Sequence, residues 1–361
     1  MEGREEVKCK RCGKRSKLIS QNIGYCVDCI RKFPDEVLPQ IKELHIKTRE
    51  AFHLPLEPPR SPEGAKCSIC INKCQIGEGE KGYCGLRLNK EGKLINLAGT
   101  KEGAVVEWYY DSLPTNCVAD WVCEGSKEIG YSNLAVFYGA CTYNCLFCQN
   151  WHYRNLLSKM NLRSAQELVD AVDERVACIC YFGGDPTPQL THALEASKLA
   201  LEKKKNLRVC FETNGSMNPE LLERAARLSL ESGGCIKFDL KAWDENLHIA
   251  LTSVSNRQTL KNFESLSKLI EERPKPPFLI ASTLLIPGYV DEKEVRNIAN
   301  FIAKLNPEIP YSLLGFYPHF YMKDLPTTSK DHAYRCQEVA LEAGLKKVRI
   351  GNPHLLSGEY S

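Results

Sequence analysis

Grouped cysteines constrain the fold of this chain more than any other feature of its sequence. Of its 361 residues 18 are cysteine, and most of these fall into three groups. The groups are Cys9, Cys12, Cys26 and Cys29; Cys67, Cys70, Cys74 and Cys84; and Cys141, Cys145 and Cys148. A disulfide framework is typical of short secreted chains. Residues 1–15 are charged and do not resemble a signal peptide, so the grouping favours metal ligation.

Composition and charge narrow the class of protein further. Hydrophobic residues make up 43% of the chain, which is enough for one large core with a smaller module beside it. The formal net charge is only +3, so charge does not indicate nucleic acid as a partner, although it does not exclude one. No apolar run reaches the roughly 18 residues of a membrane span. We therefore expect a cytoplasmic protein without a membrane partner.

A proline-rich stretch divides the chain. Residues 54–62 read Leu-Pro-Leu-Glu-Pro-Pro-Arg-Ser-Pro, the composition of a stiff and extended linker. The sequence predicts five parts on either side of it. They are a zinc-ribbon-like module at 1–53, the linker at 54–62, a second Cys-rich metal-binding segment at 63–129, a barrel at 130–352 and a C-terminal tail at 353–361.

Short apolar runs alternate with helical patterns from residue 134 onward. The candidate strands are residues 134–138, 178–182, 208–212, 235–240, 278–285 and 311–316, with a further short strand at 347–350. Their nearly continuous hydrophobicity is typical of parallel strands covered by helices. Helix-start signals lie between them, such as Ser164 with Glu167 and Asp291 with Glu294. The alternation predicts an α/β fold, a partial (β/α)6 TIM-type barrel with a small Cys-rich N-terminal metal-binding extension, and chemistry at the carboxyl ends of its strands.

The third cysteine group lies directly after the first candidate strand. It reads Cys141-Thr-Tyr-Asn-Cys145-Leu-Phe-Cys148, and we refer to residues 141–148 as the cysteine loop. Each of the three thiolates can ligate one iron of a four-iron cluster. A fourth cysteine is missing from the loop, which leaves one iron open to a substrate or cofactor, as in catalytic metal sites. The position after a strand favours this over a zinc site.

The cysteine loop resembles that of the radical S-adenosylmethionine (SAM) superfamily, and the match extends over roughly residues 130 to 352. The resemblance implies a 4Fe–4S cluster whose open iron is chelated by the amino and carboxylate groups of SAM. An electron from the reduced cluster would split the sulfonium bond into methionine and a 5′-deoxyadenosyl radical. The resemblance also implies a barrel of the radical SAM type and a low-potential electron donor of ferredoxin or flavodoxin type.

Further segments match the superfamily in chain order. Gly183-Gly184-Asp185, after the second strand, resembles the Gly-Gly-Glu segment whose backbone binds the amino group of SAM. Asp185 stands where Glu is usual, so the carboxylate is kept but is one methylene shorter. The resemblance therefore implies a backbone role here. Phe147 matches the apolar position that packs on the adenine.

Two later strand ends resemble the pyruvate formate-lyase activating enzyme group. The resemblance implies that Thr213, Asn214, Asp239 and Lys241 lie near the methionine carboxylate or the ribose of SAM. Residues 239 and 241 share one face of a strand, and a lysine there can pair with a carboxylate. Within this group, the residues around the cysteine loop are most similar to the AmmeMemoRadiSam-system radical enzymes and their archaeal relatives.

The remaining cysteines leave several alternatives open. Cys9-x2-Cys12 and Cys26-x2-Cys29 have the spacing of a tetrahedral zinc site, favoured here over mononuclear iron or no metal. The group Cys67, Cys70, Cys74 and Cys84 fits zinc and a second iron–sulfur cluster about equally well. Cys117 and Cys123 flank Trp121, where an inert structural role is favoured over a place in a site. The scattered cysteines are expected to be small buried hydrophobic residues. They are Cys178, Cys180, Cys210, Cys235 and Cys336.

Three functions compete. The leading one is a radical SAM enzyme that abstracts hydrogen from a protein or peptide, as a glycyl-radical activating enzyme does, and its substrate class rests on analogy. The alternative is a radical SAM C-methyltransferase or RNA-modifying enzyme, although the chain has no cobalamin signature of the form D-x-H-x2-G. The third is a non-catalytic metal-binding scaffold, which the retention of Cys141, Cys145 and Cys148 disfavours.

Overall fold

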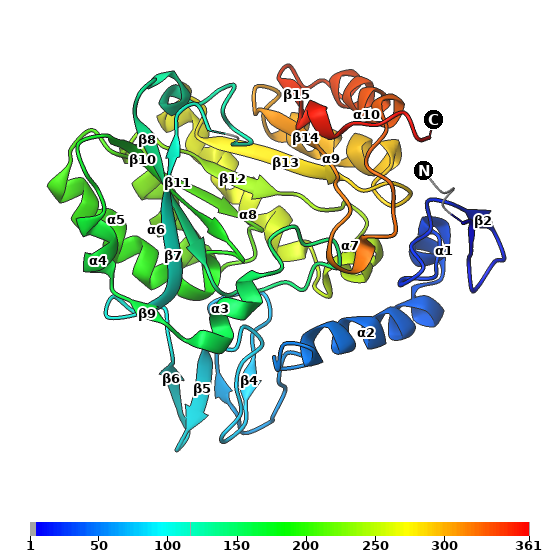
Figure 1. The fold of residues 1–361 in the computed structure, drawn as a ribbon, viewed down its shortest axis with the longest axis horizontal. Helices are drawn as coiled ribbons and strands as arrows, with labels where there is room; N and C mark the ends of the chain where they lie inside the picture. Colours follow the sequence, from blue (N-terminus) through cyan, green and yellow to red (C-terminus); the bar gives the residue numbers. More distant parts are fainter. Residues whose placement is uncertain (1–4, 116, 361) are drawn as a thin grey trace.

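The computed structural model describes residues 5–115 and 117–360 (Figure 1). Residues 1–4 and 361, at the outer ends of the predicted N-terminal module and C-terminal tail, lie outside the described residues, as does residue 116. Among the described residues, nine strands form one central sheet in the order β15-β14-β13-β12-β11-β10-β8-β7-β9. These strands are β7 (Ala104–Ser112), β8 (Ser132–Tyr138), β9 (Leu162–Arg163), β10 (Val176–Gly183), β11 (Arg208–Thr213), β12 (Ile236–Asp239), β13 (Leu279–Leu285), β14 (Tyr311–Gly315) and β15 (Val348–Gly351).

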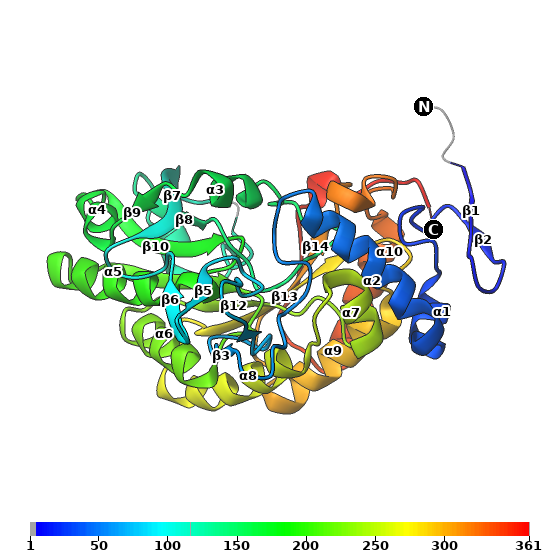
Figure 2. The ribbon, with the colours of Figure 1, turned by 90° about the horizontal axis from the view of Figure 1, so that it is seen from below.

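The strands β8 and β10 to β15 pair in parallel, and helices connect them. The helices are α3 (Tyr153–Lys159), α4 (Ala165–Asp170), α5 (Leu190–Lys203), α6 (Pro219–Glu231), α7 (Glu245–Thr252), α8 (Arg257–Ser267), α9 (Glu292–Leu305) and α10 (Lys330–Glu342). In Figure 2, α5, α6, α8 and α9 lie along the outer side of the curved sheet. The strand order ends at β15 and β9, so the described sheet does not close. The predicted α/β fold is thereby confirmed, and the short strand expected at 347–350 is present as β15.

Local signals explain where these helices begin. Ser164 and Glu167 form the capping box at the start of α4, with each side chain bonded to the backbone of the other. Asn218 caps α6, which has Pro219 in its first turn, and Asp291 caps α9 by accepting from Glu294 N. These caps fix the helix starts that follow β9, β11 and β13.

Two strands of the central sheet were not predicted, β7 and the two-residue β9. β7 lies within the range 63–129 and pairs antiparallel with β8, from Val106 opposite Tyr138 to Ser112 opposite Ser132. Its first residues, Ala104 to Val106, are buried, and most of the others are partly or fully exposed. β7 therefore covers the edge of the parallel sheet next to the strand that leads into the cysteine loop.

The N-terminal residues form small elements beside the barrel. They are β1 (Val7–Lys8), β2 (Arg15–Ser16), α1 (Val27–Lys32), α2 (Pro34–Glu50), β3 (Ala65–Lys66), β4 (Gln75–Ile76), β5 (Arg87–Lys90) and β6 (Lys93–Asn96). Figure 1 shows α2 running from the α1 module toward the hairpins of β3 to β6. The first two strands and α1 carry the first cysteine group, and the β3–β4 hairpin carries most of the second.

A buried ion pair fastens α1 to the barrel. Arg31 donates to Asp291 and to Glu294 of α9, each at 2.8 Å. The side chains of Arg31 and Glu294 are only 9% and 1% exposed. Nearby, Ser20 N donates to the Tyr289 hydroxyl at 3.0 Å. The N-terminal module is therefore packed onto the barrel through specific polar contacts.

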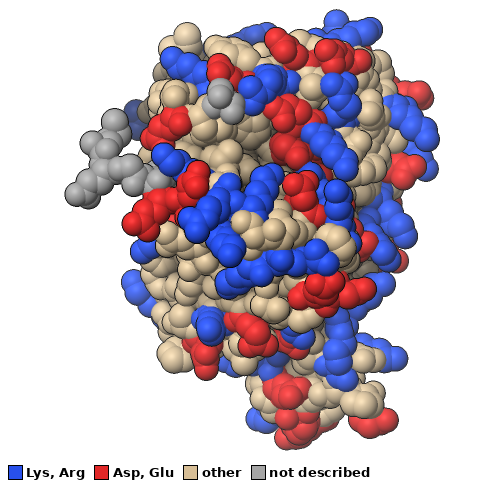
Figure 3. Space-filling model, turned by 90° about the vertical axis from the view of Figure 1, so that its right-hand side faces the viewer, with Lys and Arg blue, Asp and Glu red and all other residues tan. Residues whose placement is uncertain are grey.

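The surface that carries α1 and α2 has mixed charge. Figure 3 shows this side with a band of Lys and Arg across its middle and Asp and Glu on both sides of the band. Some of the basic residues are paired within the module, as Arg11 is with Glu36 at 2.8 Å. No helix among the described residues is long and apolar enough to cross a membrane.

Candidate active site

The cysteine loop follows β8 and is held by α2 and α7. Asn144 N donates to Thr252 O at 2.9 Å, and Leu146 N donates to Leu251 O at 3.0 Å, at the end of α7. The buried Asn144 side chain donates to Thr48 Oγ1 of α2 at 2.7 Å. The loop is therefore fixed by protein contacts alone, as a preorganised set of ligands requires.

A neutral histidine on α2 supports the same contact. His45 Nε2 lies 3.0 Å from Ala250 O, and its Nδ1 lies 3.1 Å from Asn144 Nδ2. Burial lowers the pKa of His45 to about 4, so the ring is neutral. Nε2–H then donates to the carbonyl and Nδ1 accepts from the amide. This arrangement links α2, α7 and the cysteine loop.

The N-terminal module reaches the cysteine loop by a second route. Asn22 Nδ2 donates to Tyr321 O at 2.7 Å, and Tyr321 N donates to Leu146 O at 3.0 Å. One residue, Tyr321, thus joins the module to the middle of the loop. The module is part of the scaffold of the site.

The end of β10 packs against the cysteine loop without space for a side chain. Gly183 has φ +111°, and a Cβ on it would lie 2.5 Å from Tyr138 N. A Cβ on Gly184 would lie 2.3 Å from Ala140 O, in the residue just before the loop. Only glycine permits this close backbone approach. The pair therefore brings the backbone of β10 alongside the first cysteine.

Asp185 acts as a brace between two strand ends. Its carboxylate accepts hydrogen bonds from Thr187 N at 2.8 Å, Asn214 N at 2.7 Å and Thr213 Oγ1 at 3.0 Å. Burial raises the pKa of Asp185, while these donors act in the opposite direction. The side chain is only 3% exposed. Its acceptor positions are used within the protein, so it positions the loop after β11.

Lys241 is the charged group on the opposite wall. Its ammonium lies 3.0 Å from Asp239 Oδ2 and 5.6 Å from the centre of the Phe147 ring. Ser282 Oγ donates to Asp239 Oδ1 at 2.8 Å. Burial alone would lower the pKa of Lys241, but the paired Asp239 carboxylate outweighs it, and the net shift is upward. Lys241 therefore stays protonated beside the cysteine loop.

The cysteine-loop thiols and all the residues expected to contact SAM line one cavity at the carboxyl ends of the strands. They are Cys141, Cys145, Phe147, Cys148, Gly183, Gly184, Asp185, Thr213, Asn214, Asp239 and Lys241. Three thiols thus share a cavity with a glycine cradle and a lysine–carboxylate pair. The cavity fits a thiolate-bound cluster on one side and a small ligand bearing amino and carboxylate groups on the other.

Two buried cations favour negative charge on the loop. Burial raises the pKa of the Cys145 thiol to about 12, against the opposing effects of Lys241 and Arg154. Arg154 is 2% exposed, and one of its nitrogens donates to Asn144 Oδ1 at 3.0 Å. Deprotonation of such a buried thiol is coupled to the arrival of a metal, and the nearby cations compensate the resulting charge.

Sequence reasoning missed part of this environment. Arg154 was not singled out, although it follows the loop by six residues and begins α3 with Tyr153. Tyr143 was also missed; it lines the cavity and shares a hydrogen bond of 2.7 Å with Thr259 Oγ1. An arginine in an otherwise apolar and aromatic stretch, Trp-His-Tyr-Arg-Asn-Leu-Leu, was the available signal.

The first cysteine group forms a compact site. The sulfurs of Cys9, Cys12, Cys26 and Cys29 all lie within 4.8 Å of one another. The Cys9–Cys29 and Cys12–Cys26 sulfur pairs are each 3.8 Å apart. A tetrahedron with metal–sulfur bonds of about 2.3 Å has edges of about 3.8 Å. The four thiols therefore have the geometry of a mononuclear tetrahedral site.

The second cysteine group is more widely spaced. Cys67, Cys70, Cys74 and Cys84 line one small cavity, which Thr142 of the cysteine loop also borders. Across residues 5–115 and 117–360, the Cys9 group is the one compact set of three or more ligand atoms, so these four sulfurs do not converge in the same way. Sulfurs that bind different irons of one cluster are farther apart than sulfurs around a single ion.

Known proteins resemble this chain in the region of the site. A family model described as the radical SAM superfamily matches residues 135–302, which include the cysteine loop and the strand ends of the cavity. The chain is 30% identical over 208 residues to a putative glycyl-radical enzyme activating enzyme of Methanocaldococcus jannaschii. That alignment covers 56% of this chain and 75% of the relative.

Two further proteins resemble part of the chain. The isethionate sulfite-lyase activating enzyme of Desulfovibrio desulfuricans is 29% identical over 177 residues, which cover 45% of this chain and 54% of the relative. Among solved structures, a domain of pyruvate-formate lyase-activating enzyme from Bacteroides vulgatus has 23% identity and a TM-score of 0.39. It aligns with 48% of this chain and 98% of its own.

Proposed function

Because this chain belongs to the radical SAM superfamily, we propose that it reductively cleaves SAM and uses the radical to abstract hydrogen from a protein or peptide. Membership of the superfamily implies a 4Fe–4S cluster and SAM. When bound and reduced, the cluster would supply the electron that divides SAM into methionine and a 5′-deoxyadenosyl radical. The observation that carries the proposal is the shared cavity of Cys141, Cys145 and Cys148 with the strand ends.

We assign the cluster to the three thiols of the cysteine loop. Gly183 and Gly184 line the same cavity, and we propose that their backbone binds the amino group of SAM. The Lys241 ammonium, paired with Asp239 at 3.0 Å, is suited to orient a carboxylate. Phe147 offers an apolar ring in the same cavity for the adenine.

Relatives support a macromolecular substrate. Two of them are named as activating enzymes, one for glycyl-radical enzymes in general and one for isethionate sulfite-lyase. Both names describe enzymes that activate another enzyme, so a protein or peptide is the substrate class we propose. An electron donor of ferredoxin or flavodoxin type would supply the reducing equivalent.

We propose zinc for the Cys9 group, because its 3.8 Å sulfur spacing matches a tetrahedral thiolate site. For the second cysteine group, Cys67, Cys70, Cys74 and Cys84, we propose a second iron–sulfur cluster, because its four sulfurs are spread around a cavity. Metal analysis of the anaerobically purified protein tests both assignments. About one zinc per chain is expected, and it should be lost in Cys12→Ser but not in Cys336→Ser.

Product analysis tests the cleavage reaction. The reconstituted and reduced protein is incubated with SAM under anaerobic conditions, and 5′-deoxyadenosine is measured by mass spectrometry. The wild type should form it and Cys145→Ala should not. Equal amounts from the two proteins, or none from a wild type that carries its cluster, would contradict the proposal.

Deuterium transfer tests the substrate class. The host organism is grown in deuterated medium, and its extract is divided into protein, RNA and small-molecule fractions. Deuterium should enter 5′-deoxyadenosine only with the protein fraction, and protease treatment should abolish it. Transfer from the RNA fraction that ribonuclease abolishes would instead favour the RNA-modifying alternative.

A further inference from the structure

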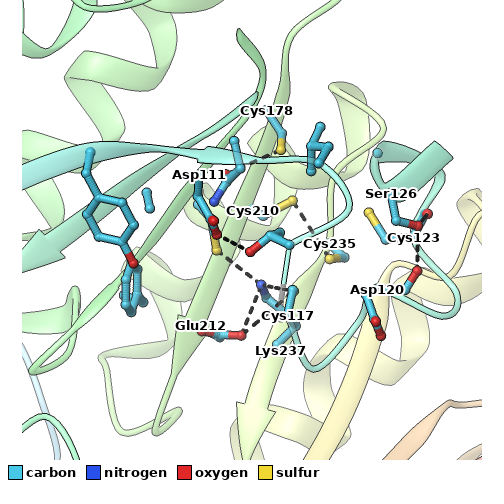
Figure 4. A pocket seen from close by; sticks show the side chains of 18 residues that line it. Asp111, Cys117, Asp120, Cys123, Ser126, Cys178, Cys210, Glu212, Cys235 and Lys237 are labelled. Atoms are coloured by element: carbon cyan, nitrogen blue, oxygen red, sulfur yellow. Dashed lines mark hydrogen bonds and ion pairs between the residues drawn. The ribbon is translucent and has the colours of Figure 1, made fainter. Parts of the chain in front are cut away.

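Six cysteines that are scattered in sequence line a second cavity, which Figure 4 shows from close by. We call it the thiol cavity. Cys178 and Cys180 lie in β10, Cys210 lies in β11, and Cys235 directly precedes β12. The other two, Cys117 and Cys123, lie in the loop between β7 and β8.

Strand register explains the convergence. Cys180 of β10 lies opposite Cys210 of β11, and Glu212 of β11 lies opposite Lys237 of β12. Side chains two residues apart in a strand share a face, so Cys235 points the same way as Lys237. Adjacent strands therefore present thiols toward the barrel interior at one level. Bulky aliphatic side chains usually fill this layer of a barrel.

The layer is hollow as a result. The thiol cavity has a volume of about 110 Å³. A single water needs roughly 10–15 Å³ by the same kind of measure, so there is room for a small inorganic group. Cys180, Cys210 and Cys235 pack with Ala119 and Ile280, but this packing leaves the space beside the thiols open.

A buried ammonium faces the thiols. Lys237 is 2% exposed, and its Nζ lies 3.1 Å from the sulfurs of Cys117 and Cys180. The Oε1 atom of Glu212 lies 3.2 Å from the same Lys237 nitrogen. Figure 4 shows Lys237, Glu212 and Cys117 close together in the cavity. A buried cation in this position stabilises negative charge on neighbouring sulfurs.

The sulfur spacing favours a cluster over a single ion. Cys210 and Cys235 have their sulfurs 3.8 Å apart. Among the residues that the structure describes, however, no three ligand atoms of this cavity lie within 4.8 Å of one another. One tetrahedral ion needs four ligand atoms in that range, as in the Cys9 group. A polynuclear centre accommodates the wider arrangement.

The loop of residues 117–126 covers one side of the thiol cavity, which stays partly open to solvent there. Trp121 Nε1 donates to Ser312 Oγ of β14 at 3.1 Å, and Asp120 pairs with Arg349 of β15 at 2.8 Å. These contacts pin the loop to the far strands of the barrel. Cys117 and Cys123 are only partly buried, so iron and sulfide can reach them.

We propose that the thiol cavity holds an additional iron–sulfur cluster. Its ligands would be Cys180, Cys210 and Cys235 with at least one of the loop cysteines, and Lys237 would compensate its charge. The cavity shares the lining residues Phe182 and Glu212 with the active site. The additional cluster therefore lies next to the place where the radical forms. The proposal goes beyond the function proposed above and does not depend on SAM cleavage.

Metal and spectroscopic analysis of a triple variant tests this assignment. Cys180→Ala, Cys210→Ala and Cys235→Ala are combined in the full chain, which is then reconstituted with iron and sulfide. The variant should lose roughly two to four irons per chain, the content of one cluster. Its SAM-responsive paramagnetic signal and its zinc should remain. Cys336→Ala, which removes a buried thiol of α10 outside the cavity, should lose no iron.

A measurement on the wild type covers the case in which the variant does not fold. The reconstituted protein is alkylated with and without prior removal of iron by a chelator, and the modified cysteines are identified by mass spectrometry. Chelation should increase labelling of the thiol cavity and leave Cys336 unchanged. Unchanged iron in a folded triple variant, loss of zinc in place of iron, or labelling that does not respond to chelation would overturn the proposal.

Discussion

The ion pair between α1 and α9 gives a quantitative test of how the N-terminal module is attached. Arg31→Met keeps the length of the side chain but removes its charge and its hydrogen bonds to Asp291 and Glu294. Breaking a buried pair costs about 3–5 kcal/mol. Asp291 is 32% exposed and contributes little, and Glu294 keeps two backbone donors, at 2.6 and 3.0 Å. We therefore expect a loss near the lower limit, about 3 kcal/mol.

Hydrogen exchange of the zinc-loaded protein measures this loss where it occurs. If the module opens locally, a change of about 3 kcal/mol accelerates exchange in α1 and α2 roughly 150-fold. Arg335→Met is the matched control. Arg335 of α10 also pairs with a residue of α9, Glu292, at 2.6 Å, but its side chain is 47% exposed. This control should change exchange by less than about fivefold. Equal effects of the two substitutions would refute the reasoning.

Three further predictions concern the active site and the zinc module. Gly184→Ala should abolish SAM binding by the reconstituted protein, measured by equilibrium dialysis, because the new Cβ would meet Ala140 O at 2.3 Å; Gly358→Ala, which meets nothing within 4 Å, should bind normally. Lys241→Met should weaken SAM binding by roughly 10- to 100-fold, the worth of a charged hydrogen bond, while the exposed Lys198→Met should have no effect. An unchanged dissociation constant in Lys241→Met would remove its assignment to the carboxylate. Chelation of zinc should accelerate hydrogen exchange at residues 9–29 and, through Asn22 and Tyr321, in the cysteine loop; an effect confined to the module would argue against the bracing role.

Much of the barrel could be predicted because its signals are local. The parallel strands are short apolar runs, and caps such as Ser164 and Asp291 mark helix starts within three or four residues. The cysteine loop is likewise contiguous. Its partners Gly184 and Lys241 were found by resemblance to family segments, and the structure places them in the same cavity.

The features that were missed depend on contacts between distant residues. β7 is partly exposed and is defined by its pairing with β8, about 20 residues later. Arg154 shows its importance only through burial against Asn144. The thiol cavity arises because strand register brings together Cys180, Cys210 and Cys235. In the sequence each is an isolated cysteine in an apolar run, where a packing role is the ordinary expectation.

The central claim is that the cysteine loop leaves one iron open for SAM. Electron–nuclear double resonance of the reduced protein tests it directly, with SAM that carries magnetic isotopes at its amino nitrogen and carboxylate oxygen. Both labels should couple to the cluster in the wild type, and neither should couple in Cys145→Ala. A reduced wild-type cluster that binds SAM but shows no coupling to either label would contradict it.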